Sequence, residues 1–484
     1  MSASSSPPAK PRLSQRLDGV LLTILGVSLA LRVILAIRGG AEYYPDEGRF
    51  NAAISAVESL RAGDTDNFFR LIFSTADHLG YKASMTLPAW CLLQWHWNLA
   101  TMAVLSSGIF STANIGWIYA LARRTGAGRA EARWSALLMA ASCSMFYWSR
   151  HLMPYDYALF LGLACLYVSL HPAPRWHHSL TAGVLGFCTF VTYNGSWSLV
   201  AFILTAHVLR TWPWWRRWRQ FLLRSGCALA GLVLPFLGLV YWAAGRQFFL
   251  LDSYIGFSNS IFQGDFGDAH RFILEYLWAA EKGLLLVWLG CLAWFVAVGA
   301  WRPASGRGRA VLWLSGLLTL VAVFIGFCDV EHKFVVYGRL VRQIVPFACL
   351  LGGWVLAHWR VAEARQGRLQ AALAAAIVVI GGWNLAQPLR QRWDFHREAL
   401  QVRDRYLQQP ENRDVALNRI VFLNEGYIWP EPLKYNLPPY QVLLSRPHIM
   451  QFRALLYEGY NREQREKILA TDITMRVVVL DRSP

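Results

Sequence analysis

The chain has 484 residues, of which 55% are hydrophobic and only 16% are charged, and its mean hydropathy is +0.29. Soluble domains of this length carry about 25% charged residues, so the composition excludes an ordinary soluble protein. The net charge of +17 does not indicate nucleic-acid binding, because the basic residues are scattered over several short loops.

Long apolar runs recur along the chain, and each run of about 18 or more such residues predicts a membrane-spanning helix. The first run follows a basic, Ser- and Pro-rich tail without a clear cleavage site, so we expect a retained anchor. About eleven spans are predicted, near residues 19–38, 98–122, 133–149, 154–170, 179–194, 196–210, 222–245, 281–300, 310–328, 340–359 and 369–387. The sequence therefore predicts a polytopic α-helical membrane protein.

Basic residues gather in alternate connections between these spans. The connections "RRTGAGRAEAR", "RTWPWWRRWRQ", "WRPASGRGR" and "WRVAEARQGR" all lie on the side of the N-terminus. Because cytoplasmic loops carry an excess of lysine and arginine, this pattern predicts a cytoplasmic N-terminus. We expect a bacterial inner (plasma) membrane protein whose C-terminal region is periplasmic or extracellular.

Three outer regions are too long to be turns. The first, residues 39–97, contains "EGRFNAAISAVESLRAG", in which one helical face carries the apolar residues Phe50, Ala53, Ile54, Val57 and Leu60, as in a helix at the membrane interface. The second is residues 246–280, and the third is residues 388–484, where the long apolar runs stop. The sequence thus divides into a transmembrane domain, 1–387, and an extracytoplasmic domain, 388–484.

The C-terminal region has the pattern of a small α/β domain. Its segments "NRIVFLNEG", "YQVLLSR" and "MRVVVLD" are typical of strands, and an amphipathic helix is predicted between the last two.

Two adjacent carboxylates, Asp46 and Glu47, follow the first span in "AEYYPDEGRFNAA". Asp46 could simply cap the next helix, with Glu47 complementing the helix dipole. Capping alone does not need two carboxylates beside Tyr44 at the membrane edge, where ionisable groups tend to be functional. The pair could also hold a divalent metal ion, although no complete ligand set is visible.

Cations that could bind an anionic substrate occur at the outer ends of later spans. Arg339 and Arg342 are three residues apart on one helical face, and His332, Lys333 and Tyr337 lie close to them in the sequence. The alternative is that these long side chains only extend to the interface.

Two further cations are candidates for substrate contacts. Lys82 lies in the first outer region, where it could instead be a solvated loop residue. Arg150, in "SRHLMPYD", could instead form an ion pair with Asp156.

The first span, "YYPDEGRFNAA" and a helix ending at Gly63 together resemble the GT-C superfamily of membrane glycosyltransferases. The nearest branch is the protein O-mannosyltransferases and the ArnT-like aminoarabinose transferases. Segments similar to that group follow in order: "GYKASMTLP", "YWSRHLMPYDYALFLGLACLYV", "GFCTFVTYNGSWSLV" and "YGRLVRQIVPFACLLGG". The first departs from the family pattern, since Ala83 and Ser84 stand where prolines are common. The resemblance covers nearly the whole chain, although only the acidic pair is a specific motif.

The resemblance implies a polyprenyl-phosphate-dependent, inverting glycosyltransferase acting on the outer face of the membrane. Asp46 would be the general base for an acceptor hydroxyl, with Glu47 beside it. The donor phosphate would contact Lys82, Lys333, Arg339 or Arg342, because the leaving group needs cationic partners. Tyr44, Arg150, His332 and Tyr337 are further substrate-binding candidates.

Two other classes remain. A lipid or polysaccharide transporter, or flippase, would explain the spans, but transporters usually have repeat symmetry and charges near the midplane. A non-catalytic subunit of a glycan-assembly complex is the other alternative, although the intact acidic pair favours an enzyme. The expected partners are a polyprenyl-phosphate sugar, a glycan, lipid or protein acceptor, and the membrane, without nucleic acid and without a certain cofactor.

Overall fold

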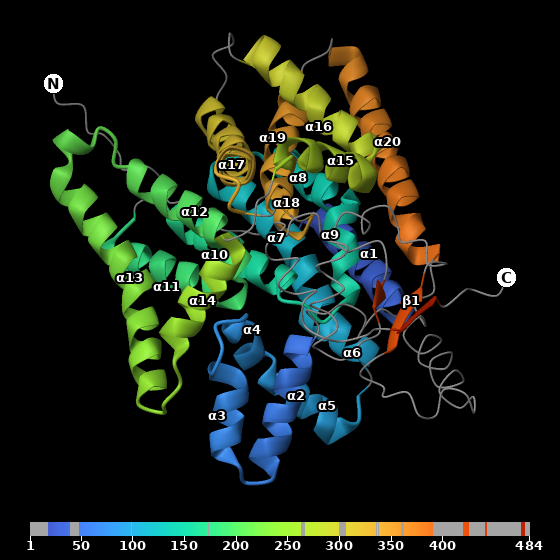
Figure 1. Ribbon diagram of the computed structural model, residues 1–484. Coiled ribbons are helices and arrows are strands. Elements are labelled where there is room, and N and C mark those ends of the chain that lie inside the picture. The colour runs from blue at the N-terminus through green and yellow to red at the C-terminus, as the bar shows by residue number, and fades with distance from the viewer. Residues whose placement is uncertain are drawn as a thin grey trace.

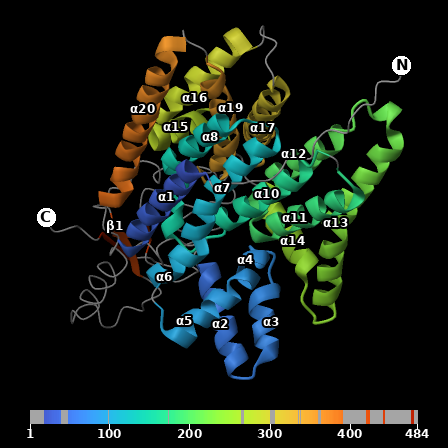
Figure 2. The same ribbon diagram turned by 180° about the vertical axis from the view of Figure 1, so that it is seen from behind.

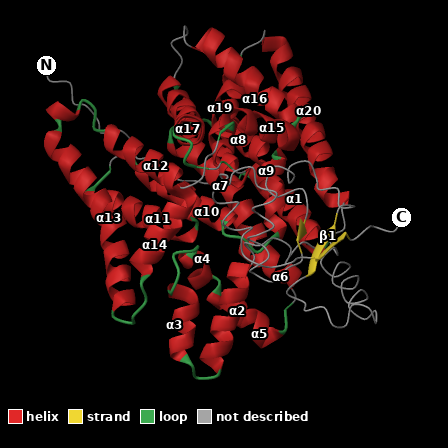
Figure 3. Ribbon diagram, in the orientation of Figure 1, coloured by secondary structure: helices red, strands yellow, loops and turns green. Residues whose placement is uncertain are grey.

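The computed structural model describes residues 18–38, 48–97, 99–172, 174–262, 267–299, 306–334, 336, 338–359 and 363–390, and three short strands beyond them. Nearly all of this part of the chain is helical (Figures 1 and 3). The helices are α1 (Gly19–Ile37), α2 (Gly48–Arg61), α3 (Thr65–Phe73), α4 (Leu79–Ser84), α5 (Thr86–Trp95), α6 (Leu99–Ala103), α7 (Ile109–Arg124), α8 (Arg129–Ala141), α9 (Cys143–Tyr147), α10 (Tyr155–Ser169), α11 (Trp176–Thr192), α12 (Trp197–Leu209), α13 (Trp218–Ala244), α14 (Leu250–Phe262), α15 (Ala269–Glu281), α16 (Gly283–Trp294), α17 (Arg307–Ile325), α18 (Gly338–Val341), α19 (Val345–His358) and α20 (Glu363–Arg390).

Helices long and apolar enough to cross a membrane confirm a polytopic membrane protein. Within the described residues there are six, or seven if the bent pair α15–α16 is one span. The segments Tyr155–Ser169 and Asn194–Leu209 are apolar but shorter. About eleven spans were predicted from hydropathy, so several predicted spans are shorter or more broken than an apolar run alone indicates.

Helix α1 is fixed at its start by Asp18. The Asp18 carboxylate accepts from the backbone N–H of Val20, from the Tyr119 hydroxyl at 2.9 Å and from Arg133 at 3.0 Å. The Arg133 guanidinium lowers the pKa of this carboxyl to about 2. These bonds attach the start of α1 to α7 and α8.

The four helices α2–α5 form a separate group at one end of the molecule in both ribbon views (Figures 1 and 2). The predicted amphipathic helix is confirmed as α2, and its Phe50, Ala53 and Val57 are buried. They pack in one cluster with Tyr81 and Met85, so the apolar face of α2 is covered by the segment around α4 and α5. Leu60, predicted on the same face, is 45% exposed because it lies in the last turn of α2, beyond the residues that α4 and α5 cover.

Helix α19 forms the centre of the bundle. Its span is Gly338–His358, and 94% of an 18-residue apolar stretch of this span is buried inside the protein. In the other five long spans the buried share of such a stretch is 17–50%. A Cβ atom on Gly353 would lie 2.0 Å from the Ser135 hydroxyl oxygen, so the missing side chain lets α19 approach α8 closely.

Two chain breaks meet inside the bundle: one between α8 and α9, at Ser142, and one between α15 and α16, at Lys282. Between α15 and α16 the chain turns by 120°, and Lys282 has a φ of 44°. The Glu281 carboxylate accepts from the Ser142 hydroxyl at 2.6 Å and from the backbone N–H groups of Cys143 and Ser144 at 3.0 Å each. The Asn384 side chain donates to the Glu281 carbonyl at 2.7 Å. The Glu281 carboxylate therefore satisfies two N–H groups at the α8–α9 break, and α20 satisfies the Glu281 carbonyl.

Helices α11 and α13 pack with their backbones in close contact. A Cβ atom on Gly183 would lie 2.1 Å from the Ala228 carbonyl oxygen, and one on Gly231 would lie 2.2 Å from the Leu180 carbonyl oxygen. Glycine at both positions permits this approach, as is common between membrane helices.

Three short strands fall inside the segments predicted as strands near the C-terminus. They are β1 (Ile420–Asn424), β2 (Gln441–Val442) and β3 (Arg476–Val479). Strand β1 pairs antiparallel with β2 and parallel with β3, with Ile420 opposite Arg476. The predicted helix and the rest of the predicted α/β domain lie outside the described residues, so that domain stays a prediction.

Candidate functional site

The predicted acidic pair lies outside the described residues. Asp46, Glu47 and Tyr44 belong to the segment 39–47, and Tyr337 is likewise outside. Their predicted roles stay predictions, and the described part of the candidate site consists of the basic residues and their neighbours.

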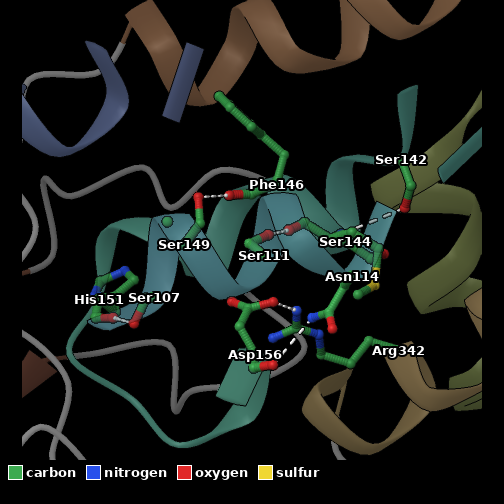
Figure 4. Close-up of polar contacts among 12 residues, drawn as sticks. Ser107, Ser111, Asn114, Ser142, Ser144, Phe146, Ser149, His151, Asp156 and Arg342 are labelled. Carbon is green, nitrogen blue, oxygen red and sulfur yellow. Dashed lines mark hydrogen bonds and ion pairs between the residues drawn. The ribbon is translucent and has the colours of Figure 1, made fainter. Parts of the chain in front are cut away.

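Arg342 lies just before α19, where it is 2% exposed. Its Nη2 atom is 2.5 Å from the carboxylate of Asp156, which is in the first turn of α10. Figure 4 shows the two side chains pointing toward each other. The Arg342 Nε and Nη1 atoms have no hydrogen-bond partner among the residues that the structure describes. Two donors of a buried guanidinium are therefore available for a ligand.

A second arginine contributes charge to the same place. Arg32, in the middle of α1, is 1% exposed and lies within electrostatic range of Asp156 and Arg342. Its Nε atom donates to the Ser111 hydroxyl at 2.9 Å. Asp156 thus pairs with Arg342 while Arg32 lies within electrostatic range of both, which leaves a net positive charge among these three groups. A buried excess charge is costly unless an anion is present.

A small pocket of about 10 Å³, enough for about one water molecule, lies next to Arg342. It is lined in part by Tyr155, Tyr193, Arg339, Arg342 and Gln343. The half-buried Arg339 donates from Nη1 to the Tyr155 hydroxyl at 3.3 Å. The structure therefore brings both predicted arginines to one pocket, as their spacing on one helical face indicated.

Lys82 is buried in α4, with 4% of its surface exposed, rather than solvated in a loop. Its ammonium group donates to the Thr75 hydroxyl at 2.9 Å. Burial lowers the pKa of Lys82 to about 8, and the nearby positive charge of Arg49 opposes the effect of Asp77. A cation with a lowered pKa in a buried position is typical of a binding site.

Tyr193 connects the Lys82 segment with the arginine pocket. Its ring lies 5.2 Å from that of His78 and 4.9 Å from that of Tyr155, between ring centroids. The Asn194 side chain also donates to the Ala76 carbonyl at 3.2 Å. The contacts of Tyr193 and Asn194 depend on packing that sequence spacing does not reveal.

The remaining predicted cations have different surroundings. Arg150 is buried with its guanidinium 4.9 Å from the centre of the Tyr147 ring, and Asp156 pairs with Arg342 instead. The pairing of Arg150 with Asp156, considered as an alternative, is therefore wrong. Lys333 is exposed and 3.9 Å from the Glu331 carboxylate, and His332 is exposed with a φ of 53°.

Arg32 and Tyr155 are site residues that were not predicted from the sequence. Arg32 carried a usable signal, because an arginine in the middle of an apolar span is a functional candidate by default. Tyr155 carried none, since tyrosines are common near the ends of membrane helices.

A larger apolar cavity of about 260 Å³ lies between α15, α16, α17 and α19. Its lining includes Leu277, Trp288, Ile344 and Val345, and His270 is among the few polar residues that line it. Ile344 and Val345 immediately follow Arg342 and Gln343, which line the small pocket. One short segment of chain therefore presents the cationic Arg342 and the polar Gln343 to one pocket and two apolar residues to the other.

No group of three or more His, Cys, Asp or Glu side chains that could hold a metal ion occurs within the described part of the chain. Because Asp46 and Glu47 are not in that part, the metal expectation for the acidic pair stays open.

No protein-family model and no curated protein sequence matches the chain. Among solved structures, the apo form of ArnT from Cupriavidus metallidurans is similar with a TM-score of 0.54, at 14% identity over 87% of this chain and 85% of that one. ArnT bound to undecaprenyl phosphate gives a TM-score of 0.48 at 16% identity, over 75% of this chain and 64% of the ArnT chain, which is less than two thirds of its length.

The archaeal oligosaccharyltransferase AglB from Archaeoglobus fulgidus, with an inhibitory peptide and a dolichol-phosphate, gives a TM-score of 0.49 at 11% identity, over 95% and 69% of the two chains. At these identities the similarity concerns the fold alone. The chain is structurally similar to ArnT, a GT-C membrane glycosyltransferase.

Proposed function

We propose that this chain is a GT-C-type glycosyltransferase that moves a sugar from a polyprenyl-phosphate donor to a hydroxyl acceptor. The observation that carries the proposal is the segment 342–345. Arg342 and Gln343 line a polar pocket of about 10 Å³, while Ile344 and Val345 line an apolar cavity of about 260 Å³. A phosphate at Arg342 would require the side chains around the small pocket to move apart. A lipid phosphate is the class of ligand with both an anionic and a long apolar part. The fold shared with ArnT supports this assignment.

Arg342 is the main candidate for the phosphate. Its two hydrogen-bond donors that lack partners among the described residues belong to a guanidinium group that is 2% exposed. Charge-assisted hydrogen bonds from arginine to phosphate are short and strong. Arg32 adds positive charge at the same place, and Arg339 lines the same pocket. Lys82 would reach the phosphate from the side of α4, across the contact between His78 and Tyr193.

In the proposed reaction, the acceptor oxygen forms a bond to the anomeric carbon as the bond from that carbon to the phosphate oxygen breaks. The polyprenyl phosphate leaves with the bonding electrons, and the arginines stabilise its added charge. The acceptor proton passes to Asp46, the proposed general base, while Glu47 orients the acceptor or adjusts the basicity of Asp46. Direct displacement of this kind inverts the anomeric centre.

The oxocarbenium-like transition state of glycosyl transfer is stabilised by nearby negative charge. The acidic pair would supply that charge on the acceptor side. If a divalent metal binds there, the two carboxylates would hold it, and it would further polarise the acceptor hydroxyl.

The test is consumption of a radiolabelled polyprenyl-phosphate sugar by the purified protein with a membrane extract as the acceptor source. Asp46→Asn should lower the rate about 10²–10⁴-fold, because asparagine caps a helix about as well as aspartate but cannot accept the proton. Asp66→Asn, an exposed acid of α3 in the same outer region, is the matched control and should stay near wild type.

Three outcomes would count against the proposal or part of it. A folded Asp46→Asn variant with near wild-type turnover removes Asp46 as the base. A dead Glu47→Gln variant beside an active Asp46→Asn variant moves that role to Glu47. Movement of the intact donor across vesicles without cleavage would identify a transporter instead.

A further inference from the structure

A second concentration of positive charge lies far from the site described above. The segments 123–129, 174–178 and 207–224 contain nine arginines and neither aspartate nor glutamate. They include the ends of α7 and α12 and the starts of α11 and α13. Helix α13 has 27 residues, which corresponds to about 40 Å of helix, and α14 follows its opposite end (Figures 1 and 2). We call the surface formed by these segments the arginine–tryptophan surface.

Side-chain contacts hold this surface together. The Arg210 Nη1 atom donates to the Ser169 carbonyl at 2.8 Å and to the His171 carbonyl at 3.2 Å. Arg124 lies over the ring of Tyr167, 4.5 Å from its centre. The ends of α7, α10 and α12 therefore meet at one place.

The positive charges here are not neutralised by the protein. None of the nine arginines forms an ion pair with any residue that the structure describes. The buried Nε atom of Arg124 has no hydrogen-bond partner within the same described set. Arg210 and Arg124 both contact the last turn of α10, through the Ser169 carbonyl and the Tyr167 ring, and Arg224 lies within electrostatic range of Arg210. Such crowding is unfavourable unless an anion occupies the site.

Exposed tryptophans surround the arginines. Trp176, Trp212 and Trp218 are 57%, 61% and 54% exposed, and the Trp212 and Trp215 rings are 4.7 Å apart in an edge-to-face arrangement. Exposed tryptophan at the end of a membrane bundle marks the depth of the lipid head groups. An anion at this depth is part of a lipid rather than a freely dissolved polyanion.

We propose that the arginine–tryptophan surface binds the phosphate head group of an anionic phospholipid, with Arg124, Arg210 and Arg224 around the phosphate. Basic pockets between membrane helices recognise anionic lipids in this way, and each basic residue near such a surface contributes about a fivefold gain in affinity. The alternative is that these arginines only set the orientation of the chain in the membrane. Arginines with that role alone would not need to gather at one place in the fold.

The experiment measures binding of dioctanoyl phosphatidylglycerol and dioctanoyl phosphatidylcholine to the full-length protein in detergent by native mass spectrometry. We expect the wild type to prefer phosphatidylglycerol. The double variant Arg124→Gln/Arg224→Gln should bind it about 30-fold more weakly, with phosphatidylcholine binding unchanged. Arg210 is left in place because it also holds two carbonyl groups.

The matched control is Arg61→Gln/Arg271→Gln, which removes two exposed arginines outside this surface and so changes the net charge equally. This control should bind phosphatidylglycerol like the wild type. Equal loss in both double variants, or no loss in either, would overturn the proposal. If glycerol 1-phosphate binds as tightly as phosphatidylglycerol, the surface is a site for soluble anions, and the lipid assignment is overturned.

A measurement on the wild type covers the case in which the double variant does not fold. The affinity for phosphatidylglycerol should fall as NaCl rises from about 50 to about 500 mM, because salt screens exposed charges, and the affinity for phosphatidylcholine should not. Affinity for phosphatidylglycerol that is independent of salt would contradict a site built from arginines.

Discussion

Arg342 has two roles that a pair of variants can separate. It neutralises Asp156, and we propose that it binds the donor phosphate through its other donors. Arg342→Ala should lower the melting temperature, because removing one partner of a buried ion pair costs about 3–5 kcal/mol. It should also lower kcat/KM about 10–150-fold, the loss expected for a hydrogen bond to a charged group worth about 1.5–3 kcal/mol.

The double variant Arg342→Ala/Asp156→Asn removes the carboxylate, for which the single variant leaves Arg32 as the neighbouring cation among the described residues. Its melting temperature should recover much of the loss, while its turnover should stay low. Thermal unfolding in detergent and donor consumption measure the two effects. If turnover recovers together with stability, Arg342 serves only to balance the charge of Asp156.

Lys82 should make donor use depend on pH near 8, since burial lowers its pKa to about that value. As pH rises through 8, the folded protein loses the Lys82 charge, so kcat/KM, which reports groups of the free enzyme, should fall. Lys82→Arg keeps its charge in this range and should give a flat profile between about pH 7 and 9. A falling limb that persists unchanged in Lys82→Arg would assign it to another group.

The lowered pKa of Lys82 also affects folding stability, which should rise with pH where kcat/KM falls. Between about pH 8 and the ordinary lysine pKa of about 10.4, the unfolded chain holds a proton at Lys82 that the folded protein has released. Stability therefore rises with pH across this window. In Lys82→Met, unfolding measured from pH 7 to 10 should lack this rise.

At the scale of single residues, the sequence predicted the arginines better than their partners. Arg339 and Arg342 were identifiable because they are three apart at the start of an apolar run. Asp156 precedes Arg342 by 186 residues, so no local spacing could predict their ion pair. Arg150 is much closer to Asp156 in the sequence, and that proximity favoured the wrong partner.

The contact between α11 and α13 gives a prediction about elements. Gly183→Ala would place a methyl group 2.1 Å from the Ala228 carbonyl oxygen, so the two helices would have to separate. Overpacking of this kind costs about 1–3 kcal/mol, and we expect a lower melting temperature in detergent.

Gly226→Ala is the matched control, because a Cβ atom at that position in α13 meets nothing within 4 Å. Replacing glycine by alanine inside a helix gains up to about 1 kcal/mol, so this variant should be at least as stable as the wild type. Equal melting temperatures for the two variants would show that the close approach of α11 and α13 is not required.

Helices were predictable from apolar runs, whereas their breaks were not. The amphipathic pattern of residues 47–63 correctly predicted α2, since its period depends on local sequence alone. The predicted span 133–149 is interrupted at Ser142, which bonds to Glu281, 139 residues later. A break stabilised by so distant a contact leaves no period in the local sequence.

The orientation of the whole molecule in the membrane can be tested with two single cysteines in a background without the natural ones. Ala62→Cys lies in the exposed turn between α2 and α3, and Gly128→Cys lies in the exposed turn between α7 and α8. The charge bias of the loops predicts that an impermeant maleimide labels position 62 in intact cells and position 128 only after lysis. The reverse pattern would contradict the predicted topology and the placement of the acidic pair outside.

The contact between the two chain breaks also constrains how the protein can be made. The α8–α9 break is synthesised well before Glu281, which provides the acceptors for the N–H groups of Cys143 and Ser144, and Asn384 comes later still. Until residue 281 emerges from the ribosome, those N–H groups need a temporary partner, since lipid offers none. The first helices to enter the bilayer therefore reach their final arrangement only when the last ones arrive, which makes assembly of the bundle a late and concerted event.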